Sequence, residues 1–158
     1  MNRYERLMSN NQHLGIYDNY SLDGDFHGVY ADGIVAIDKN LTSNSKLEVL
    51  CEEIAHSRIT YGNILNQEDL FFRKFEIKAR RLGNELAMSL SDIIDAFKNG
   101  VKNIFEMANF LEVSEKHVNE CLTHYKQKYG LSKKYGEFLI QFEPLRVFEY
   151  HEIKLKGN

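Results

Sequence analysis

Apolar residues recur at helical spacing at the start of the chain, and this spacing is absent from the segment that follows. Residues 1–12 predict a short polar helix, because Tyr4, Leu7 and Met8 lie three or four apart and share one face. Residues 15–38 are rich in Gly, Asp and Tyr and hold only short β-type runs. This change of period separates a first helix from a stretch of strands.

Two short runs in that stretch have the residues of strands. Phe26–Tyr30 and Ile34–Ile37 are the best candidates, and the Asp32-Gly33 pair between them is typical of a hairpin turn. The first quarter of the chain therefore predicts a small antiparallel sheet.

Helical spacing returns at Ser45 and continues to about Gly130. Ser45 and Glu48 have the spacing of a capping box, which predicts the start of a helix there. Its apolar face is Leu47, Leu50, Cys51 and Ile54, and Gly62-Asn63 predicts its end.

Four more helices follow from the same kind of pattern. They span Leu70–Met88, Asp92–Lys98 after a cap at Ser89 or Ser91, Ile104–Leu111, and Ser114 to about Tyr129. The tail from Phe138 to Leu155 is β-like and suits either an edge strand or a packed tail. This order of elements predicts an α+β fold.

Composition narrows the class of protein. The chain has 158 residues, 43% of them hydrophobic and 27% charged, which is typical of one soluble globular domain. It has no apolar run near 18 residues and no apolar stretch of a signal peptide, so we expect a cytoplasmic protein with no membrane partner. Cys51 and Cys121 lie far apart, and no disulfide is expected.

The charge balance argues against a nucleic-acid binder. The formal net charge is −3, whereas proteins that bind nucleic acids usually carry a basic surplus. Four lysines near the C-terminus could form a local basic patch, but we interpret them as a solvated helix end: Lys126, Lys128, Lys133 and Lys134.

One predicted helix carries a group of residues that could bind a metal ion and act as a general base. Glu52 and His56 are four apart and Glu53 is three before His56, so the three side chains lie towards one side of the capped helix. In the His-Glu-x-x-His motif of zinc peptidases, the two histidines bind the metal and the glutamate takes a proton from water. Here Glu53 and His56 are in register with that motif, and Glu52 stands at the first ligand position.

A catalytic zinc site needs a third protein ligand. Glu76, twenty residues after His56 on the next helix, is the candidate. The hypothesis is therefore a Zn²⁺ site formed by Glu52, His56 and Glu76, with Glu53 as the general base. The alternative interpretation is an ordinary solvated helix face, with Glu76 forming a salt bridge to Arg80.

The order of several motifs resembles that of a known family. A Gly-x-Tyr-x-x-Gly-x-x-x-Ile region precedes the helix, and Ser57 to Leu65 follows it. The later blocks are Glu76-x-x-Ala79-Arg80-Arg81, Asn103-x-Phe105-Glu106-Met107-Ala108, Val113-Ser114-x-x-x-Val118 and Tyr125 to Gly130. From about Tyr4 to Gly130 the chain resembles the ImmA/IrrE metallopeptidases, in particular the short members found beside repressor genes in phages and mobile elements.

The resemblance implies a fold and a function. It implies a zincin-like metallopeptidase core over residues 1–90, and a helical region with a β-like tail over residues 91–158, packed together as one compact unit. Glu53 would be the general base, and His56 and Glu76 would be metal ligands. The first histidine of the family motif falls on Glu52, which we interpret as a variant of the motif. The implied substrate is a helix-turn-helix repressor encoded nearby, cleaved to induce the element.

Substrate binding and oxyanion stabilisation have weaker candidates. An edge strand around Ile34–Ile37 could hold the substrate in extended form by strand addition. Four residues could assist at the oxyanion, although each is more typical of a surface or core-edge position: His27, Tyr30, Arg58 and Tyr61.

Two other functions stay open. Glu52 suits a catalytically inactive antirepressor that binds the repressor without cutting it. Residues 105–125 have a helix-turn-helix outline, but Glu115 and Glu120 on its second helix make a poor surface for phosphates, so DNA binding is not expected. No third ligand is evident for a site at His117 and His124, and His151 is interpreted as a surface residue.

Overall fold

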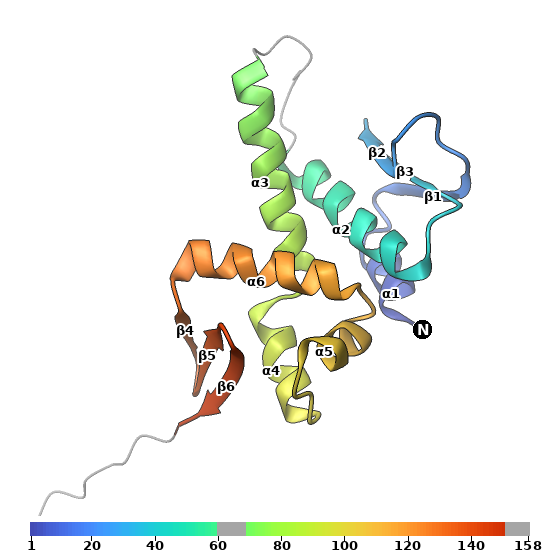
Figure 1. The fold of residues 1–158 in the computed structure, drawn as a ribbon. Helices are drawn as coiled ribbons and strands as arrows, with labels where there is room; N and C mark the ends of the chain where they lie inside the picture. The colour runs from blue at the N-terminus through green and yellow to red at the C-terminus, as the bar shows by residue number, and fades with distance from the viewer. Residues whose placement is uncertain (60–68, 151–158) are drawn as a thin grey trace, which may run out of the picture.

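The computed structural model describes residues 1–59 and 69–150, with the side chains of 69–72 excepted. The elements follow in this order: α1 (Arg3–Asn10), β1 (Gly15–Tyr20), β2 (Gly28–Ala31), β3 (Ile34–Asp38), α2 (Ser43–Ile59), α3 (Asp69–Ala87), α4 (Leu90–Lys98), α5 (Ile104–Leu111), α6 (Glu115–Tyr129), β4 (Ser132–Tyr135), β5 (Phe138–Phe142) and β6 (Leu145–Glu149). The predicted α+β fold is confirmed, with one small sheet near each end of the chain (Figure 1).

The first sheet contains the predicted hairpin and one strand that was missed. β2 and β3 pair antiparallel, and Asp32 and Gly33 between them have φ of 47° and 81°, as a tight hairpin turn requires. β1 adds to the other side of β3 in parallel, so the sheet is mixed rather than wholly antiparallel. Its polar residues Asp18 and Asn19 hid this strand from the sequence pattern.

The strand order β1-β3-β2 overturns one expectation. Ile34–Ile37 belongs to β3, the central strand, both of whose edges are already paired. It therefore cannot accept a substrate strand, and the open edges of this sheet belong to β1 and β2. Sequence marks β3 as a strand, but which strands flank it depends on where the chain returns in space.

Helix α2 packs on this sheet. Val35 and Ile37 of β3 and Leu50 and Ile54 of α2 are fully buried and form one cluster. The predicted apolar face of α1 packs against the same cluster, so the first helix covers the sheet and α2 together.

The predicted capping box at Ser45 is wrong. α2 begins at Ser43, and Thr42 precedes it and accepts a hydrogen bond from the Ser45 backbone N at 3.2 Å. Glu48 instead accepts a hydrogen bond from the backbone N of Ser114, the N-cap of α6, at 2.7 Å. The Glu48 carboxylate, which the local pattern assigned to a capping box with Ser45, therefore forms a long-range contact with α6 instead. The predicted helix end at Gly62-Asn63 lies outside the described residues.

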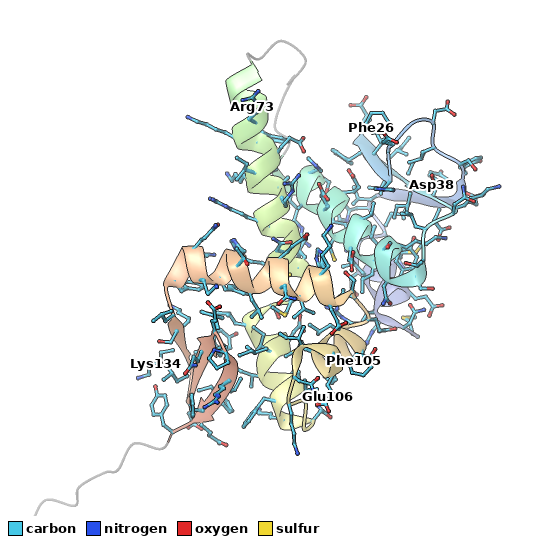
Figure 2. All side chains as sticks on the ribbon, in the orientation of Figure 1. Phe26, Asp38, Arg73, Phe105, Glu106 and Lys134 are labelled. Atoms are coloured by element: carbon cyan, nitrogen blue, oxygen red, sulfur yellow. The ribbon has the colours of Figure 1, made fainter. Side chains whose placement is uncertain are left out.

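Helices α3 to α6 match the predicted helices closely. α4 begins with a capping box between Ser89 and Asp92, and α5 and α6 begin after Asn103 and Ser114, whose side chains accept from the backbone of the first turn. Phe105 on α5 is exposed, and Glu106 beside it is half-buried (Figure 2). Its core joins α2 and α3 to α4, α5, α6 and the second sheet in one cluster.

The C-terminal tail forms a sheet of its own. β4, β5 and β6 pair antiparallel in that order, so the tail is neither an edge strand of the first sheet nor an unpaired tail. Ile140 and Phe142 of β5 are buried, and the ring of Phe142 stacks on Tyr125 of α6 with centroids 5.4 Å apart. Residues 151–155 of the predicted β-like run lie outside the described part.

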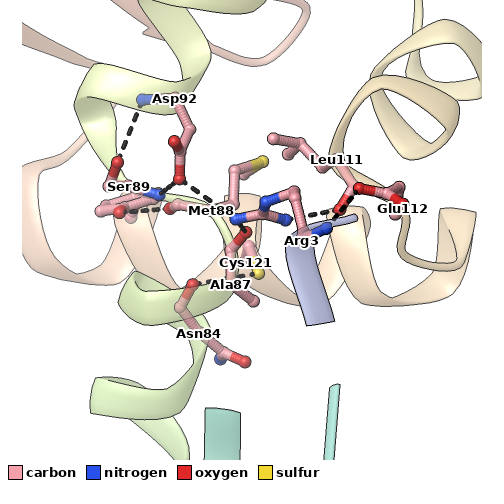
Figure 3. Close-up of polar contacts among 10 residues, drawn as sticks. Arg3, Asn84, Ala87, Met88, Ser89, Asp92, Leu111, Glu112 and Cys121 are labelled. Carbon is pink, nitrogen blue, oxygen red and sulfur yellow. Dashed lines mark hydrogen bonds and ion pairs between the residues drawn. The ribbon is translucent and has the colours of Figure 1, made fainter. Parts of the chain in front are cut away.

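Arg3 connects the first helix to the C-terminal half (Figure 3). Its guanidinium donates to the carbonyl oxygens of Leu111 and, at 2.8 Å, of Ala87, and lies 3.5 Å from the carboxylate of Asp92. Its backbone N donates to Glu112 Oε2 at 3.0 Å. One side chain thereby satisfies carbonyls at the ends of α3 and α5, which helices leave unpaired.

Two further expectations can be compared with the structure. Cys51 and Cys121 are both free and buried. Among the described residues, no helix combines the length and the apolar character that crossing a bilayer requires.

Candidate metal centre

Two neighbouring helices bring the three predicted ligands together. Glu52 and His56 are one turn apart on α2, and Glu76 lies on α3, which packs along α2. Each offers one donor atom, and the three atoms all lie within 4.8 Å of one another. His56 Nε2 is 3.6 Å from Glu76 Oε2, whereas no ion pair between Glu76 and Arg80 is found in the described part of the chain.

The spacing and the chemistry of these donors fit a divalent metal ion. Ligands about 2.0–2.2 Å from a tetrahedral zinc are roughly 3.3–3.6 Å from one another. The 3.6 Å between His56 Nε2 and Glu76 Oε2 matches that separation and is longer than a good hydrogen bond. Two carboxylates and one imidazole, all half-buried, suit zinc and also tolerate a harder ion.

Glu53 lies beside this centre but in a different environment. Its side chain is buried between α2 and β2, with only 7% of the residue exposed. Burial first, and then the negative charges of Glu52 and Glu76, raise its pKa from 4.5 to about 7. A carboxyl group with that pKa can both accept and release a proton near neutral pH. The sequence pattern placed Glu53 on an open helix face, and its burial is therefore a finding of the structure.

Gly28 of β2 makes room for Glu53, and sequence analysis missed this role. A Cβ atom there would lie 2.4 Å from Val49 Cγ1 and 3.1 Å from Glu53 Oε1. Any side chain at this position would displace the carboxylate or the strand. The signal in the sequence was a glycine inside a predicted strand, which often marks a close approach.

Gly83 of α3 has the same function between the two helices. A Cβ there would lie 3.1 Å from the backbone Cα of Glu52. Gly83 is seven residues after Glu76 and shares its face of α3, so the close crossing at Gly83 directs Glu76 towards α2. A glycine within a helical pattern was the available signal.

An aromatic contact helps to orient the imidazole. The rings of His56 and Phe75 are tilted by 34° with centroids 5.9 Å apart. Because Phe75 directly precedes Glu76, the same turn of α3 contacts the histidine through a ring and through a carboxylate.

The candidates for oxyanion assistance have other contacts. Tyr30 packs against the cluster between the sheet and α2. The carbonyl oxygen of exposed His27 accepts a hydrogen bond from the Asp38 backbone N at 2.9 Å. Arg58 is exposed on α2, and Tyr61 lies outside the described residues.

The other histidines do not gather into a second centre in the described ranges. His124 Nε2 is 3.1 Å from Glu85 Oε1, and His117 Nδ1 is 3.6 Å from Glu120. Neither belongs to a group of three metal-ligating side chains among residues 1–59 and 73–150. His151 falls outside those residues.

Comparison with known proteins identifies the family of the chain. A search of curated proteins finds no match to this chain. The sequence pattern that defines the IrrE N-terminal-like domain of the M78 peptidases matches residues 4–123, which include α2, α3 and every residue of the candidate centre. The chain therefore belongs to the M78 peptidase family, whose defining domain is the IrrE N-terminal-like domain.

Proposed function

We propose that the chain is a zinc-dependent endopeptidase that cleaves a helix-turn-helix repressor of a phage or mobile element and so induces that element. The observation that carries the proposal is the convergence of Glu52, His56 and Glu76 beside a buried glutamate, Glu53. Membership of a peptidase family supports hydrolysis as the reaction. The choice of repressor rests on the resemblance to the short phage-type members.

In the proposed mechanism, Glu53 handles the protons. Zinc held by Glu52, His56 and Glu76 would polarise the scissile carbonyl and lower the pKa of a water molecule. The Glu53 carboxylate accepts a proton from the attacking water and then donates it to the leaving amine. In the metal-free protein, burial and the charges of Glu52 and Glu76 raise the pKa of Glu53. A bound cation would lower that pKa and favour the carboxylate that accepts the proton.

The open edge of β2 is the proposed place for the substrate. β2 is an edge strand, and its Gly28 contacts Glu53, so a peptide paired along β2 passes the general base. Pairing by backbone hydrogen bonds holds a peptide extended with little demand on its side chains. This replaces β3 as the candidate for strand addition.

Glu52 favours a second candidate function. A carboxylate in place of the family histidine adds negative charge and changes the preference for the metal. A catalytically inactive antirepressor would keep the fold and the repressor-binding surface while lacking turnover. The substitution Glu52→His, which places the family histidine at this position, separates the two functions. If the chain is an inactive binder, the variant gains cleavage activity that the wild type lacks. If the chain is an active peptidase, the wild type already cleaves.

The proposed endopeptidase activity can be tested with the repressor from the same element. The full chain is loaded with zinc and incubated with the repressor, and products are identified by mass spectrometry. Glu53→Gln should lower the cleavage rate by roughly 10²- to 10⁴-fold while zinc content by atomic absorption stays the same. Glu115→Gln, an exposed glutamate on α6, is the matched control and should cleave normally.

Each result has a definite reading. Equal cleavage by wild type and Glu53→Gln would overturn the assigned role of Glu53. Zinc binding and repressor capture without cleavage would favour the inactive antirepressor. Absence of any bound metal, together with equal cleavage by wild type and Glu53→Gln, would rule out the metallopeptidase.

DNA binding is the least supported function. α5 and α6 are joined by a short turn at Glu112–Ser114, in which Glu112 has φ of 58°. The exposed side of α6 carries Glu115 and Glu120, which repel phosphates. Salt-dependent binding of duplex DNA by the isolated chain would favour this function again.

A further inference from the structure

The two edges of the C-terminal sheet differ in character. β4 carries Lys133 and Lys134, whose ammonium groups lie over the rings of Tyr129 and Tyr150. Lysines along an edge discourage another strand from pairing there. β6 carries Leu145, Val147 and half-exposed Phe148 beside Arg146 and Glu149, so its edge is more apolar than that of β4.

The hydrogen-bonding groups of β6 alternate between its partner and the open side. Tyr150 N donates to Glu137 O at 2.9 Å, which marks that pair as hydrogen-bonded. In an antiparallel ladder such pairs alternate, so the backbone groups of Leu145, Val147 and Glu149 point to the open side. No backbone hydrogen bond to these three from that side is formed by the part of the chain described.

A groove runs along this open edge. A cavity of about 260 Å³ lies between β6 and the α4–α5 region. Its walls are apolar side chains and a consecutive run of β6 residues: Phe97, Val101, Met107 and residues 145–148. A second cavity of about 510 Å³ shares Lys102, Asn103 and Leu145 with the first, so the groove continues towards α6.

The two charged side chains that line the first cavity are both basic, and the Glu106 carboxylate accepts a hydrogen bond from the Lys102 backbone N at 2.6 Å. Lys102 and Arg146 line the first cavity, and neither forms an ion pair with any residue in the described ranges. Lys126 in the second cavity differs, because its ammonium is paired with Glu143. Two unpaired cations beside an apolar groove attract an acidic segment.

We infer that the β6 edge is a docking site for a protein partner, which adds an extended segment with alternating apolar side chains and flanking acidic residues as a fourth strand. Backbone bonds to Val147 hold the strand, the groove takes its apolar side chains, and Lys102 and Arg146 meet its carboxylates. A second copy of this chain is the alternative occupant, and the oligomeric state of the protein tests it. The inference does not depend on the proposed peptidase activity.

The test uses the full chain and a synthetic probe. A dye-labelled octapeptide that alternates valine with glutamate is titrated against the protein, and binding is followed by fluorescence anisotropy. We expect saturable binding, and roughly tenfold weaker binding of the same peptide with lysine in place of glutamate. The double variant Lys102→Glu, Arg146→Glu should reverse this preference without touching the core.

Proline substitution tests the strand pairing itself. Val147→Pro removes one outward N–H and should abolish binding of the acidic peptide. Lys134→Pro is the matched control on the opposite edge. Phe142 N donates to Leu131 O, and because hydrogen-bonded pairs alternate, the backbone N–H of Lys134 points away from β5. Circular dichroism checks that both variants fold.

Three results would overturn the inference. The first is equal affinity for the acidic and the lysine peptide. The second is unchanged peptide binding in the charge-reversed double variant. The third is a concentration-dependent dimer of the wild type, seen by sedimentation and lost in Val147→Pro, because it would make a second copy the occupant.

Discussion

Helix α3 makes two histidine–glutamate pairs with its neighbours, and the surroundings of the two pairs are opposite. Glu76 meets His56 of α2 at 3.6 Å, and Glu85 meets His124 of α6 at 3.1 Å. At the first pair two more carboxylates, Glu52 and Glu53, lie close by. At the second pair the ammonium group of Lys128 also binds Glu85.

The difference explains why only one pair is a candidate metal centre. Negative charge accumulates at the first pair and raises the pKa of Glu53, after burial, to about 7. At the second, burial acts to raise the pKa of Glu85, but hydrogen bonds from Lys128 and His124 outweigh it and hold that pKa below its usual value. A cation would balance the charge of the first pair, whereas Lys128 already balances the charge of the second. The same two residue types therefore differ in function because of their third neighbour.

Zinc affinity should separate the two pairs most strongly. His56→Ala removes a direct ligand, and we expect a loss of at least about a hundredfold, since even residues behind the ligands contribute 10- to 100-fold. His124→Ala should leave zinc affinity unchanged. Competition with a chromophoric chelator measures both. Equal losses of zinc affinity in the two variants would contradict the assignment of the metal centre to His56.

The pH dependence of stability should run in opposite directions. In protein treated with a chelator, the folded pKa of Glu53, about 7, exceeds the 4.5 of the unfolded chain. Its contribution to stability is therefore full below pH 4.5 and is lost as the pH rises through 7, which amounts to about 3 kcal/mol. Glu85 has a lowered folded pKa, so its contribution is present above the unfolded value and is lost as the pH falls.

Glu53→Gln should thus stabilise the metal-free protein at pH 8, and Glu85→Gln should destabilise it. Urea unfolding at pH 3, pH 5 and pH 8 with chelator gives the free energies, because the contribution of Glu85 is lost only below the unfolded pKa of 4.5. Two results would contradict the assignment: a stabilisation by Glu53→Gln that does not grow from pH 5 to pH 8, or a destabilisation by Glu85→Gln that does not shrink from pH 5 to pH 3.

Two glycine variants should sharpen the distinction between ligands and base. Gly83→Ala places a methyl 3.1 Å from Glu52 Cα, so α2 and α3 must separate. We expect a loss of about 1–2 kcal/mol, because overpacking outweighs the gain in helix propensity, together with weaker zinc binding. Gly28→Ala should instead displace Glu53 and reduce cleavage while zinc binding persists.

Calorimetry with zinc, next to a cleavage assay, distinguishes the two variants. Gly15→Ala is the control for the strand, since its added methyl would meet the Tyr17 ring at 3.3 Å and Ile34 at an ordinary 3.8 Å. Loss of zinc binding in Gly28→Ala would show that Glu53 and the ligands are not separable.

The smallest effect is expected at Lys128. Its pair with Glu85 is partly exposed, so Lys128→Ala should cost less than about 1 kcal/mol. The variant should still bind no zinc at His124, because only one carboxylate is present there. The double variant Lys128→Ala, His56→Ala lacks the first centre. If it bound zinc at His124, Lys128 alone would be what excludes the metal from the second pair.

Local signals allowed much of the helical half to be predicted. Ser89, Asn103 and Ser114 cap their helices with their own side chains, so the sequence was sufficient to place α4, α5 and α6. β1 was not predicted, because its polar residues break the strand pattern and its strand structure depends on pairing with β3. The cap at Ser45 failed because Glu48 bonds to Ser114, 66 residues away.

The sequence by itself determined which residues of the centre are chemically able to act, because Glu52, Glu53 and His56 share a helix and their spacing follows from its period. Only the tertiary structure decided that Glu76 faces them, that Glu53 is buried, and that Glu76 and Glu85 differ in their neighbours. These depend on Gly83 and Gly28, where backbone meets backbone or side chain across elements far apart in the chain. Periodicity describes one element at a time, whereas a metal centre is set by how closely two elements approach.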